Sequence, residues 1–447
     1  MKQPLDLRDT FTDSRRRIKK RLAVMLSPLL FGATAVIPAV AADLPVPATT
    51  TLERLTLRQA EQLFLERNRE LRIARRITEG AEADILSAAA PPNPALSIST
   101  SRISPSNGIG PGKLKDKYVD TVIGLSQLIE RGNKRELRTE AAQFNAAAAR
   151  NDENDVIRQQ RLVLQAAYYD LKLAQERFRI SDTTADLFDK SVAASERRLS
   201  AGDIAPTELS RIQVDASRAR NDARNARAER ERNQLLLGYL LGADRDAGRI
   251  VAADPWPSSI AQSPPTSIDD IIQRRNDVRA AQDRVSAAEK NRDLARSLRT
   301  RDVTAGIQYE RFPGDTSNNS YGFSFSIPIF ARYQYNGEIR RAEVELLTAQ
   351  ENLDRVRALA LGELSRVESD LAAADDRVRR INGILLPAAE KAANGAEFAH
   401  SRGAIGLMDL LDSRRQLYAA QLESISAYAD LAKALAAKRG ATTAIPE

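Results

Sequence analysis

Cysteine is absent from the 447-residue sequence, and histidine and methionine are scarce, with one and three residues respectively. Thiolate and imidazole groups hold most structural zinc ions and supply many nucleophiles and general bases. Their scarcity argues against a zinc site, a thiol enzyme and a disulfide-stabilised fold. In addition, no glycine-rich phosphate loop follows a predicted strand, and the carboxylates of "GAIGLMDLLDS" have no plausible nucleophile or second acid-base partner beside them. We therefore expect a protein that is not an enzyme and that holds no cofactor and no resident metal.

A large excess of one charge sign is also missing once the N-terminal segment is set aside. The formal net charge is +7, but residues 1–41 contain eight Lys or Arg and three Asp, which accounts for +5 and leaves +2 for the rest. In that remainder, charges of both signs alternate, as is typical of solvated helix faces and not of a nucleic-acid surface. We expect no nucleic-acid partner.

The N-terminal segment has the pattern of an export signal. The basic run "RRRIKKR" precedes an apolar stretch, Leu22 to Val40, which ends in the small residues "AVAAD". This order of basic, apolar and small residues is typical of a signal peptide, so we predict that residues 1–41 are removed, with cleavage near Ala41 or Ala42. A retained membrane anchor is the alternative, although prolines interrupt the stretch. No later segment has the ~18 consecutive apolar residues of a membrane helix.

A heptad pattern begins at Leu57 and continues through Phe64, Leu71, Thr78 and Ile85, with alanine at most of the second core positions. Such a pattern predicts one coiled-coil helix that packs closely against its neighbours. The helix is expected to stop at "APPNP", because consecutive prolines cannot continue it.

Two alternating segments follow this helix. They are "ALSISTSRI" and "YVDTVIGLSQLI", and a polar loop rich in glycine, proline and serine separates them. Strands of ~9 to 11 tilted residues span the outer membrane of bacteria. We predict a β-hairpin of outer-membrane type.

The second half of the chain repeats the first, with helix, strands and long helices in the same order. We expect a first repeat at residues 42–250, which contains a β-hairpin at 94–130 and a helical turn near 200–208. A linker at 251–267 should follow it. The second repeat is expected at 268–440, with a β-hairpin at 302–330 and a turn near 401–409, and a flexible tail at 441–447 ends the chain.

The last predicted strand has two distinct faces. Aromatic and branched side chains alternate with glycine and serine, which suits lipid on one face and water on the other. The apolar face consists of Tyr321, Phe323, Phe325, Ile327 and Ile329. Four strands are too few to close a barrel, and open strand edges are not tolerated in lipid, so several copies must pool their strands. The predicted fold is mainly α with a β-barrel part.

This pattern resembles the TolC family of outer-membrane efflux ducts over about residues 55–440. The phrases "PNPALSI", "QLIERGNKRELR", "FSIPIFARYQYNGEIRRAE", "LSAGDIAPTEL" and "SRGAIGLMDLLD" are most similar to its CzcC branch, which serves heavy-metal cation exporters. The resemblance implies a homotrimer with a twelve-stranded barrel in outer-membrane lipid and a long periplasmic tunnel of helices. It also implies two partners, a periplasmic adaptor and an inner-membrane pump of the resistance-nodulation-division type, with the duct itself passive.

The resemblance also implies roles for the two helical turns. Asp409 and Asp412 match the acids that ring the constriction, and Glu208 occupies the equivalent place in the first repeat. The adaptor is expected to contact the turns at Gly202, Asp203, Gly403 and Ala404.

Two positions depart from the family pattern near the second turn. His400 stands where a tyrosine is usual, and Ile405 stands where an arginine is usual, so the family's gate contacts cannot form in the same way. These two residues are candidate neighbours of the gate.

The residues alone leave other interpretations open. Positions i and i+3 share a helix face, so Asp409 and Asp412 would form two carboxylate rings in a trimer and attract cations. Alternatively, the acids only stabilise helix N-termini, where the macrodipole favours negative charge. For the whole chain, the alternatives are an exported soluble coiled-coil scaffold or adaptor, and the same duct serving drug efflux or protein secretion.

Overall fold

The computed structural model describes residues 52–101, 103, 110, 113, 119–257, 267–312 and 318–442. These residues belong to the unit Thr50–Glu447. The predicted signal peptide at 1–41 lies outside the described residues, as do parts of the hairpin loops.

The heptad segment forms two helices, α1 (Leu57–Arg67) and α2 (Arg69–Ala89), and not the single helix that the pattern predicts. A reciprocal capping box between Thr56 and Gln59 starts α1, which satisfies N–H groups that the first turn leaves free. The break falls at Asn68, whose side chain accepts from the backbone N–H of Leu71 (3.2 Å) and donates to the carbonyl of Leu240 (3.0 Å). The buried asparagine thus caps α2 and ties it to a distant helix end.

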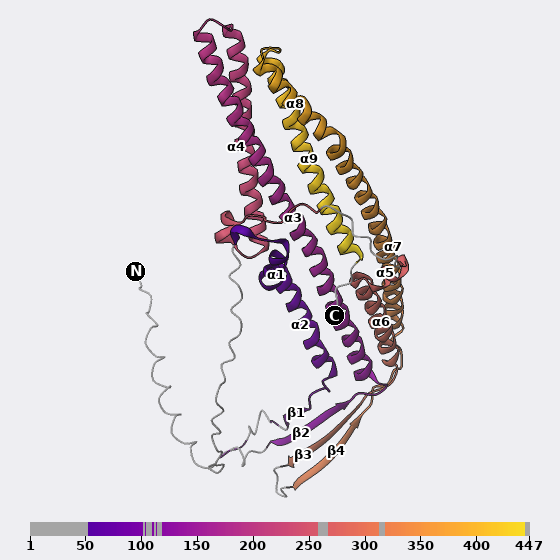
Figure 1. The fold of residues 1–447 in the computed structure, drawn as a ribbon. Coiled ribbons are helices and arrows are strands. Elements are labelled where there is room, and N and C mark those ends of the chain that lie inside the picture. The colour runs from indigo at the N-terminus through magenta and orange to yellow at the C-terminus, as the bar shows by residue number, and fades with distance from the viewer. Residues whose placement is uncertain are drawn as a thin grey trace, which may run out of the picture. The chain divides into compact units, whose positions relative to one another are not determined.

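Four strands form one antiparallel sheet in the order β1-β2-β3-β4 (Figure 1). The pairing of β2 with β3 joins the two halves of the chain. β4 ends at Ser326, so the prediction that Ile327 and Ile329 continue the apolar face of the strand is wrong. Pro328 lies between them and has no N–H to donate to a sheet. The strands are β1 (Ala95–Ser101), β2 (Asp120–Ile129), β3 (Val303–Phe312) and β4 (Asn318–Ser326).

Long helices carry the chain away from the sheet. α3 (Lys134–Ser200) contains 67 residues, which corresponds to about 100 Å at 1.5 Å per residue. α4 (Pro206–Leu240) returns along it and places alanines at three- and four-residue spacing against it. The second half follows the same path with α5 (Ile268–Arg274), α6 (Asn276–Ser297), α7 (Asn336–Arg380), a π-helical turn η4 (Ile381–Leu385), α8 (Leu386–Ser401) and α9 (Leu407–Thr442).

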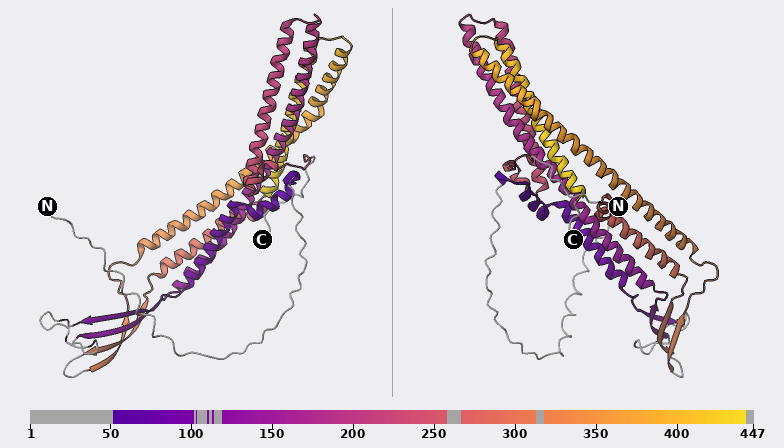
Figure 2. Two further views of the ribbon diagram at one scale, coloured as in Figure 1. Left: turned by 90° about the vertical axis from the view of Figure 1, so that its left-hand side faces the viewer. Right: turned by 45° about the vertical axis from the view of Figure 1, so that its right-hand side comes forward.

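The two halves share unusual backbone angles where their long helices begin. Asn133 precedes α3 and Tyr335 precedes α7, and each has a φ of +58°, in the left-handed region that few non-glycine residues adopt. The hairpins α3–α4 and α8–α9 extend side by side to the end opposite the sheet, with α9 in contact with α3 (Figure 2). The π-helical turn that divides α7 from α8 precedes Pro387, which cannot donate to the helix ladder.

Part of the predicted linker at 251–267 is packed against the helices. Residues 251–253 exchange backbone hydrogen bonds with Leu52 and Leu55, and a short helix η3 (Asp244–Arg249) precedes them. Tyr168 of α3 is fully buried and donates to the carbonyl of Leu55 (2.9 Å) and to Asp254 (3.0 Å). The segment therefore packs against the middle of α3. Residues 258–266 lie outside the described residues.

The predicted tail at 441–447 begins too early. α9 continues to Thr442, and Ala441 is buried in a cluster with Ile272, Val278 and Leu346. Residues 443–447 lie outside the described residues. Among the described helices, none combines the length and the apolar character needed to cross a membrane.

Candidate functional site at the helical turns

Both helical turns have the same backbone geometry. Gly202 (φ +83°) follows the end of α3, and Gly403 (φ +71°) follows the end of α8. In each turn the glycine N–H donates three residues back, and the next residue, Asp203 or Ala404, donates five residues back at 2.9 Å. This Schellman arrangement satisfies the last carbonyls of a helix and needs a left-handed residue, for which glycine has no steric penalty. The repeated glycines are thus explained by the turns themselves.

The predicted constriction acids lie just after these turns. Glu208 and Asp409 both occupy the third position of the following helix, and Asp412 lies one turn further along α9. Asp409 and Asp412 are exposed, whereas Glu208 is half-buried. The carboxylate of Asp409 folds back towards Gly406, at which an added Cβ would lie 3.6 Å from Oδ2. A carboxylate there favours the helix N-terminus, so the geometry suits both a capping role and a charged surface.

His400 and Ile405 are brought together within the second turn. The ring nitrogen Nδ1 of His400 lies 3.1 Å from the carbonyl oxygen of Ile405. This contact joins the end of α8 to the residues that precede α9. His400 also lines the groove described below.

The structure adds residues that the sequence pattern did not reveal. Asp412 accepts from the amide of Gln416 (2.9 Å) and lies 3.6 Å from the guanidinium of Arg415. Arg415 in turn donates to Asp215 of α4. Asp215 lies seven residues after Glu208, a spacing that places both acids on the same face of α4. Nothing close by in the sequence connects Asp215 with Arg415.

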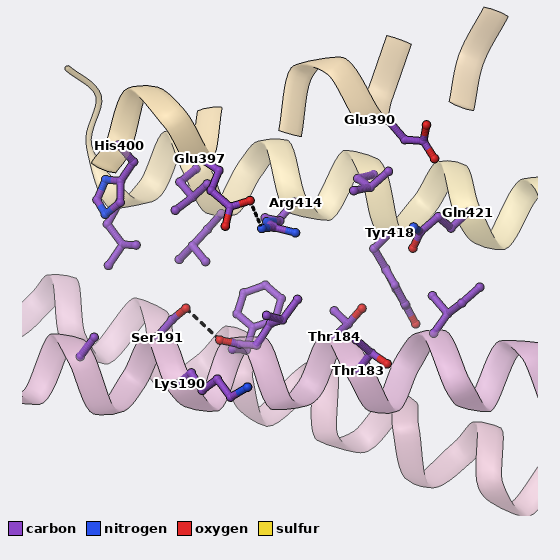
Figure 3. Close-up of a pocket in the computed structure, with 18 of the residues that line it drawn as sticks. Thr183, Thr184, Lys190, Ser191, Glu390, Glu397, His400, Arg414, Tyr418 and Gln421 are labelled. Carbon is purple, nitrogen blue, oxygen red and sulfur yellow. Dashed lines mark hydrogen bonds and ion pairs between the residues drawn. The ribbon is translucent and has the colours of Figure 1, made fainter. Parts of the chain in front are cut away.

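A groove of about 580 Å³ is lined by residues of α3, α8 and α9. Figure 3 shows His400, Glu397 and Arg414 on one side of it, and Thr184, Lys190 and Ser191 of α3 on the other. Arg414 pairs with Glu397 within the second hairpin. In the part of the chain that the structure describes, no cluster of three or more His, Asp or Glu side chains is placed to hold a metal ion.

A duplicated chain of long helical hairpins, joined by a sheet with exposed aromatic side chains, defines the class of channel-forming export proteins. The chain belongs to the outer membrane efflux protein family, whose model matches residues 61–243 and 267–442. This match confirms the resemblance to the TolC family and the predicted mixed fold.

Known relatives and a solved structure agree with this membership. The cobalt-zinc-cadmium resistance protein CzcC of Cupriavidus metallidurans is 25% identical over 382 residues, covering 82% of this chain and 85% of CzcC. Protein CyaE of Bordetella pertussis is 25% identical over 357 residues, covering 77% of this chain and 74% of CyaE. The crystal structure of the Campylobacter jejuni CmeC outer membrane channel has the same fold, with a TM-score of 0.73, 16% identity and coverage of 93% and 94%.

Membership of this family decides between a membrane channel and a soluble scaffold. The protein is an outer-membrane efflux channel with a long periplasmic helical extension. Channels of this family are passive, so the protein is not an enzyme. The alternative of an exported soluble scaffold is therefore wrong.

Proposed function

We propose that the chain is the exit duct of a tripartite efflux system and that it conducts divalent heavy-metal cations. The observation that supports a cation as the cargo is the pair of exposed carboxylates on α9, Asp409 and Asp412, close to the turn end of the hairpins. Rings of carboxylates favour cations in channels. The similarity to CzcC, a cobalt-zinc-cadmium resistance protein, supports the same cargo.

The assembly that we propose is a homotrimer. The sheet of one chain ends in two edge strands, β1 and β4, and unpaired strand edges are not tolerated in lipid. Three copies would supply twelve strands and would bring Asp409, Asp412 and their symmetry equivalents around one axis. The predicted partners are a periplasmic adaptor, which would contact Gly202, Asp203, Gly403 and Ala404 at the turns, and an inner-membrane pump of the resistance-nodulation-division type.

Removing the charge of both acids is expected to weaken cation preference. The variant is Asp409→Asn with Asp412→Asn. Two unit charges ~4 Å apart in water attract each other by about 1 kcal/mol. Losing this attraction between the carboxylates and a passing cation should lower the cation-over-anion permeability ratio roughly fivefold. The reversal potential of the channel in a planar bilayer with a salt gradient measures this ratio.

The matched control is Glu423→Gln, because Glu423 is an exposed acid on the same helix, further from the turn. It should leave the reversal potential unchanged. If the double variant also leaves it unchanged, the acids act only at the helix N-terminus.

The cargo is tested in cells. We expect that deleting the gene lowers tolerance to zinc, cobalt and cadmium, and that the intact gene restores it, because cations delivered by the pump would have no exit without the duct. Tolerance to organic toxicants should change little. Unchanged metal tolerance with altered tolerance to drugs, or with a defect in protein secretion, would replace the metal assignment with one of those cargoes.

A further inference from the structure

The segment that joins β4 to α7 gathers aromatic rings and arginines at the end of the sheet from which the helices leave (Figure 1). The ring of Tyr335 meets the ring of Phe330 edge-on, with centroids 5.3 Å apart, and lies 5.9 Å from the ring of Tyr333. The guanidinium of Arg301, just before β3, lies 5.5 Å from the centre of the Phe330 ring, which is within the range of a cation–π contact. We define the junction cluster as Phe330, Tyr333 and Tyr335 together with Arg299, Arg301 and Arg332.

The backbone of Tyr335 carries a strain that the turn before α7 does not require. Its φ of +58° is also the value at Asn133, the corresponding residue of the first repeat. Asparagine adopts this left-handed conformation readily, whereas a bulky residue there is an outlier. Such outliers persist only where the surrounding structure holds them, and they cluster at functional sites. Because asparagine makes the same turn in the first repeat, the turn alone does not account for the tyrosine.

The three arginines of the junction cluster are exposed, and within the part of the chain that the structure describes none of them pairs with a carboxylate. Arg299 donates instead to the side-chain oxygen of Asn336 (2.8 Å) and to the carbonyl of Gln334 (3.4 Å). It therefore holds the segment before α7 in place, while Arg301 and Arg332 keep guanidinium donors available for an anion.

Two carboxylates belong to the same stretches of chain. Asp302 pairs with Lys134 at 2.7 Å, so its charge is already matched. Glu338 accepts a hydrogen bond from the hydroxyl of Tyr333 at 2.5 Å and contributes one negative charge. Three arginines outnumber this one carboxylate, and the junction cluster keeps a net positive charge.

The junction cluster lies at the border between the exposed apolar face of the sheet and the periplasmic helices. Phe325 and Ile329, which precede it in the chain, are 75% and 81% exposed, and the helices that follow belong to the periplasmic extension. Tyrosine rings concentrate at the boundary between hydrocarbon and water. Arginine keeps its apolar stem in the hydrocarbon and extends its charge to the headgroups, where the planar guanidinium fits two oxygens of a phosphate.

The first repeat has no such cluster at its equivalent junction. Residues 130–133, between β2 and α3, include no aromatic residue. Arg131 and Arg135 are exposed there, and no described carboxylate pairs with either of them. Each chain therefore carries one combination of rings and arginines at this depth, on the second repeat.

We propose that the junction cluster binds the phosphate of an anionic phospholipid in the periplasmic leaflet of the outer membrane. Arg301 and Arg332 donate to the phosphate oxygens, and the aromatic rings pack beside the glycerol and the first methylenes of the acyl chains. A zwitterionic lipid binds less well, because its own ammonium group already neutralises its phosphate. The inference rests on the outer-membrane location of the family and not on the proposed cargo.

The test titrates the full chain, purified in detergent, with phosphatidylglycerol or phosphatidylcholine, and native mass spectrometry counts the lipids that the folded channel retains. The unmodified protein should retain phosphatidylglycerol in preference. Arg301→Gln with Arg332→Gln is expected to weaken this binding at least about tenfold, which corresponds to ~1.4 kcal/mol. The matched control, Arg131→Gln with Arg135→Gln, removes two exposed arginines at the equivalent junction of the first repeat and should leave the binding unchanged.

A second variant tests the aromatic part of the junction cluster. Tyr335→Asn keeps a residue that suits the left-handed turn, as Asn133 does in the first repeat. The channel should therefore fold normally and retain less phosphatidylglycerol, because the ring that contacts Phe330 and Tyr333 is gone.

The outcomes are distinct from one another. Unchanged phosphatidylglycerol binding in Arg301→Gln with Arg332→Gln, or in Tyr335→Asn, overturns the junction cluster as a lipid site. An equal loss in the control overturns it as well, because any positive charge at this depth would then suffice. Displacement of the lipid by an equal concentration of inorganic phosphate would replace the phospholipid with a free anion. None of these measurements involves conduction or metal tolerance, so each result leaves the duct function to its own tests.

Discussion

Arg275→Ala is expected to lower the free energy of unfolding by about 3 kcal/mol, because it removes one partner of a buried ion-pair network. The side chain of Arg275 is only 5% exposed and pairs with Asp277 (2.8 Å) and Glu363 (2.7 Å). Glu363 also accepts from Arg158 of α3 (3.3 Å). The network thus joins α3, α6 and α7, and the variant leaves two carboxylates without their main cation.

The estimate is at the lower end of the range for buried pairs because Asp277 and Glu363 remain 23% and 28% exposed. Thermal or urea unfolding in detergent, followed by helical circular dichroism, measures the difference. Arg341→Ala is the control: Arg341 forms an exposed pair with Glu345 one turn away on α7, and such pairs contribute about 0.3–0.5 kcal/mol. Equal effects of the two substitutions would contradict a structural role for the network.

The pH dependence of this effect follows from Asp277. Burial opposes its ionisation, but hydrogen bonds and charge from Arg275, with a contribution from Arg158, outweigh burial and lower the pKa of Asp277. The folded state therefore holds this proton less tightly than the unfolded chain. The stabilisation is complete above the ordinary aspartate pKa of about 3.9 and is lost as the pH falls through the lower folded value. The difference between the unmodified protein and Arg275→Ala should shrink in acid.

Phe323→Arg is expected to lower the amount of protein in the outer membrane strongly. Tyr321, Phe323 and Phe325 alternate along β4, and Phe323 is 80% exposed on a face that we expect to meet lipid. An arginine on the lipid face of a membrane strand costs about 2–4 kcal/mol near the bilayer midplane. Quantifying the chain and its oligomer in outer-membrane fractions measures the loss.

The matched control lies one residue away. Ser324 belongs to the opposite face of β4 and pairs with Gly306 of β3, which has no side chain to crowd a longer neighbour. Ser324→Arg would face water in the proposed assembly and should be recovered in nearly normal amounts. Similar recovery of the two variants would contradict the assignment of the aromatic face to lipid.

Local patterns in the sequence were sufficient for the class of fold and for the turns. The alternation in "YGFSFS" follows the two-residue period of a strand, and the heptads follow the helical period. Gly202 and Gly403 mark the turns because a left-handed backbone after a helix selects glycine. The acids Glu208 and Asp409 could be located for the same reason, since a helix N-terminus favours carboxylates whatever lies around it.

Where the prediction was wrong, a distant or non-repeating contact decided the structure. The heptad from Leu57 continues without a gap, yet the helix breaks at Asn68, because its side chain bonds to the carbonyl of Leu240. The proline-rich segment from 251 looked like a linker, but Asp254 receives hydrogen bonds from Leu57 and Tyr168.

The sequence by itself determined that this is a duplicated chain of helical hairpins with membrane-type strands and glycine turns, because each of those features follows from residues close together in the chain. Only the tertiary structure decided which side chains connect the hairpins. Arg415 and Asp215 are 200 residues apart, and no period or motif links them. Their contact exists because α4 and α9 both pack against α3, which brings the two opposite charges together.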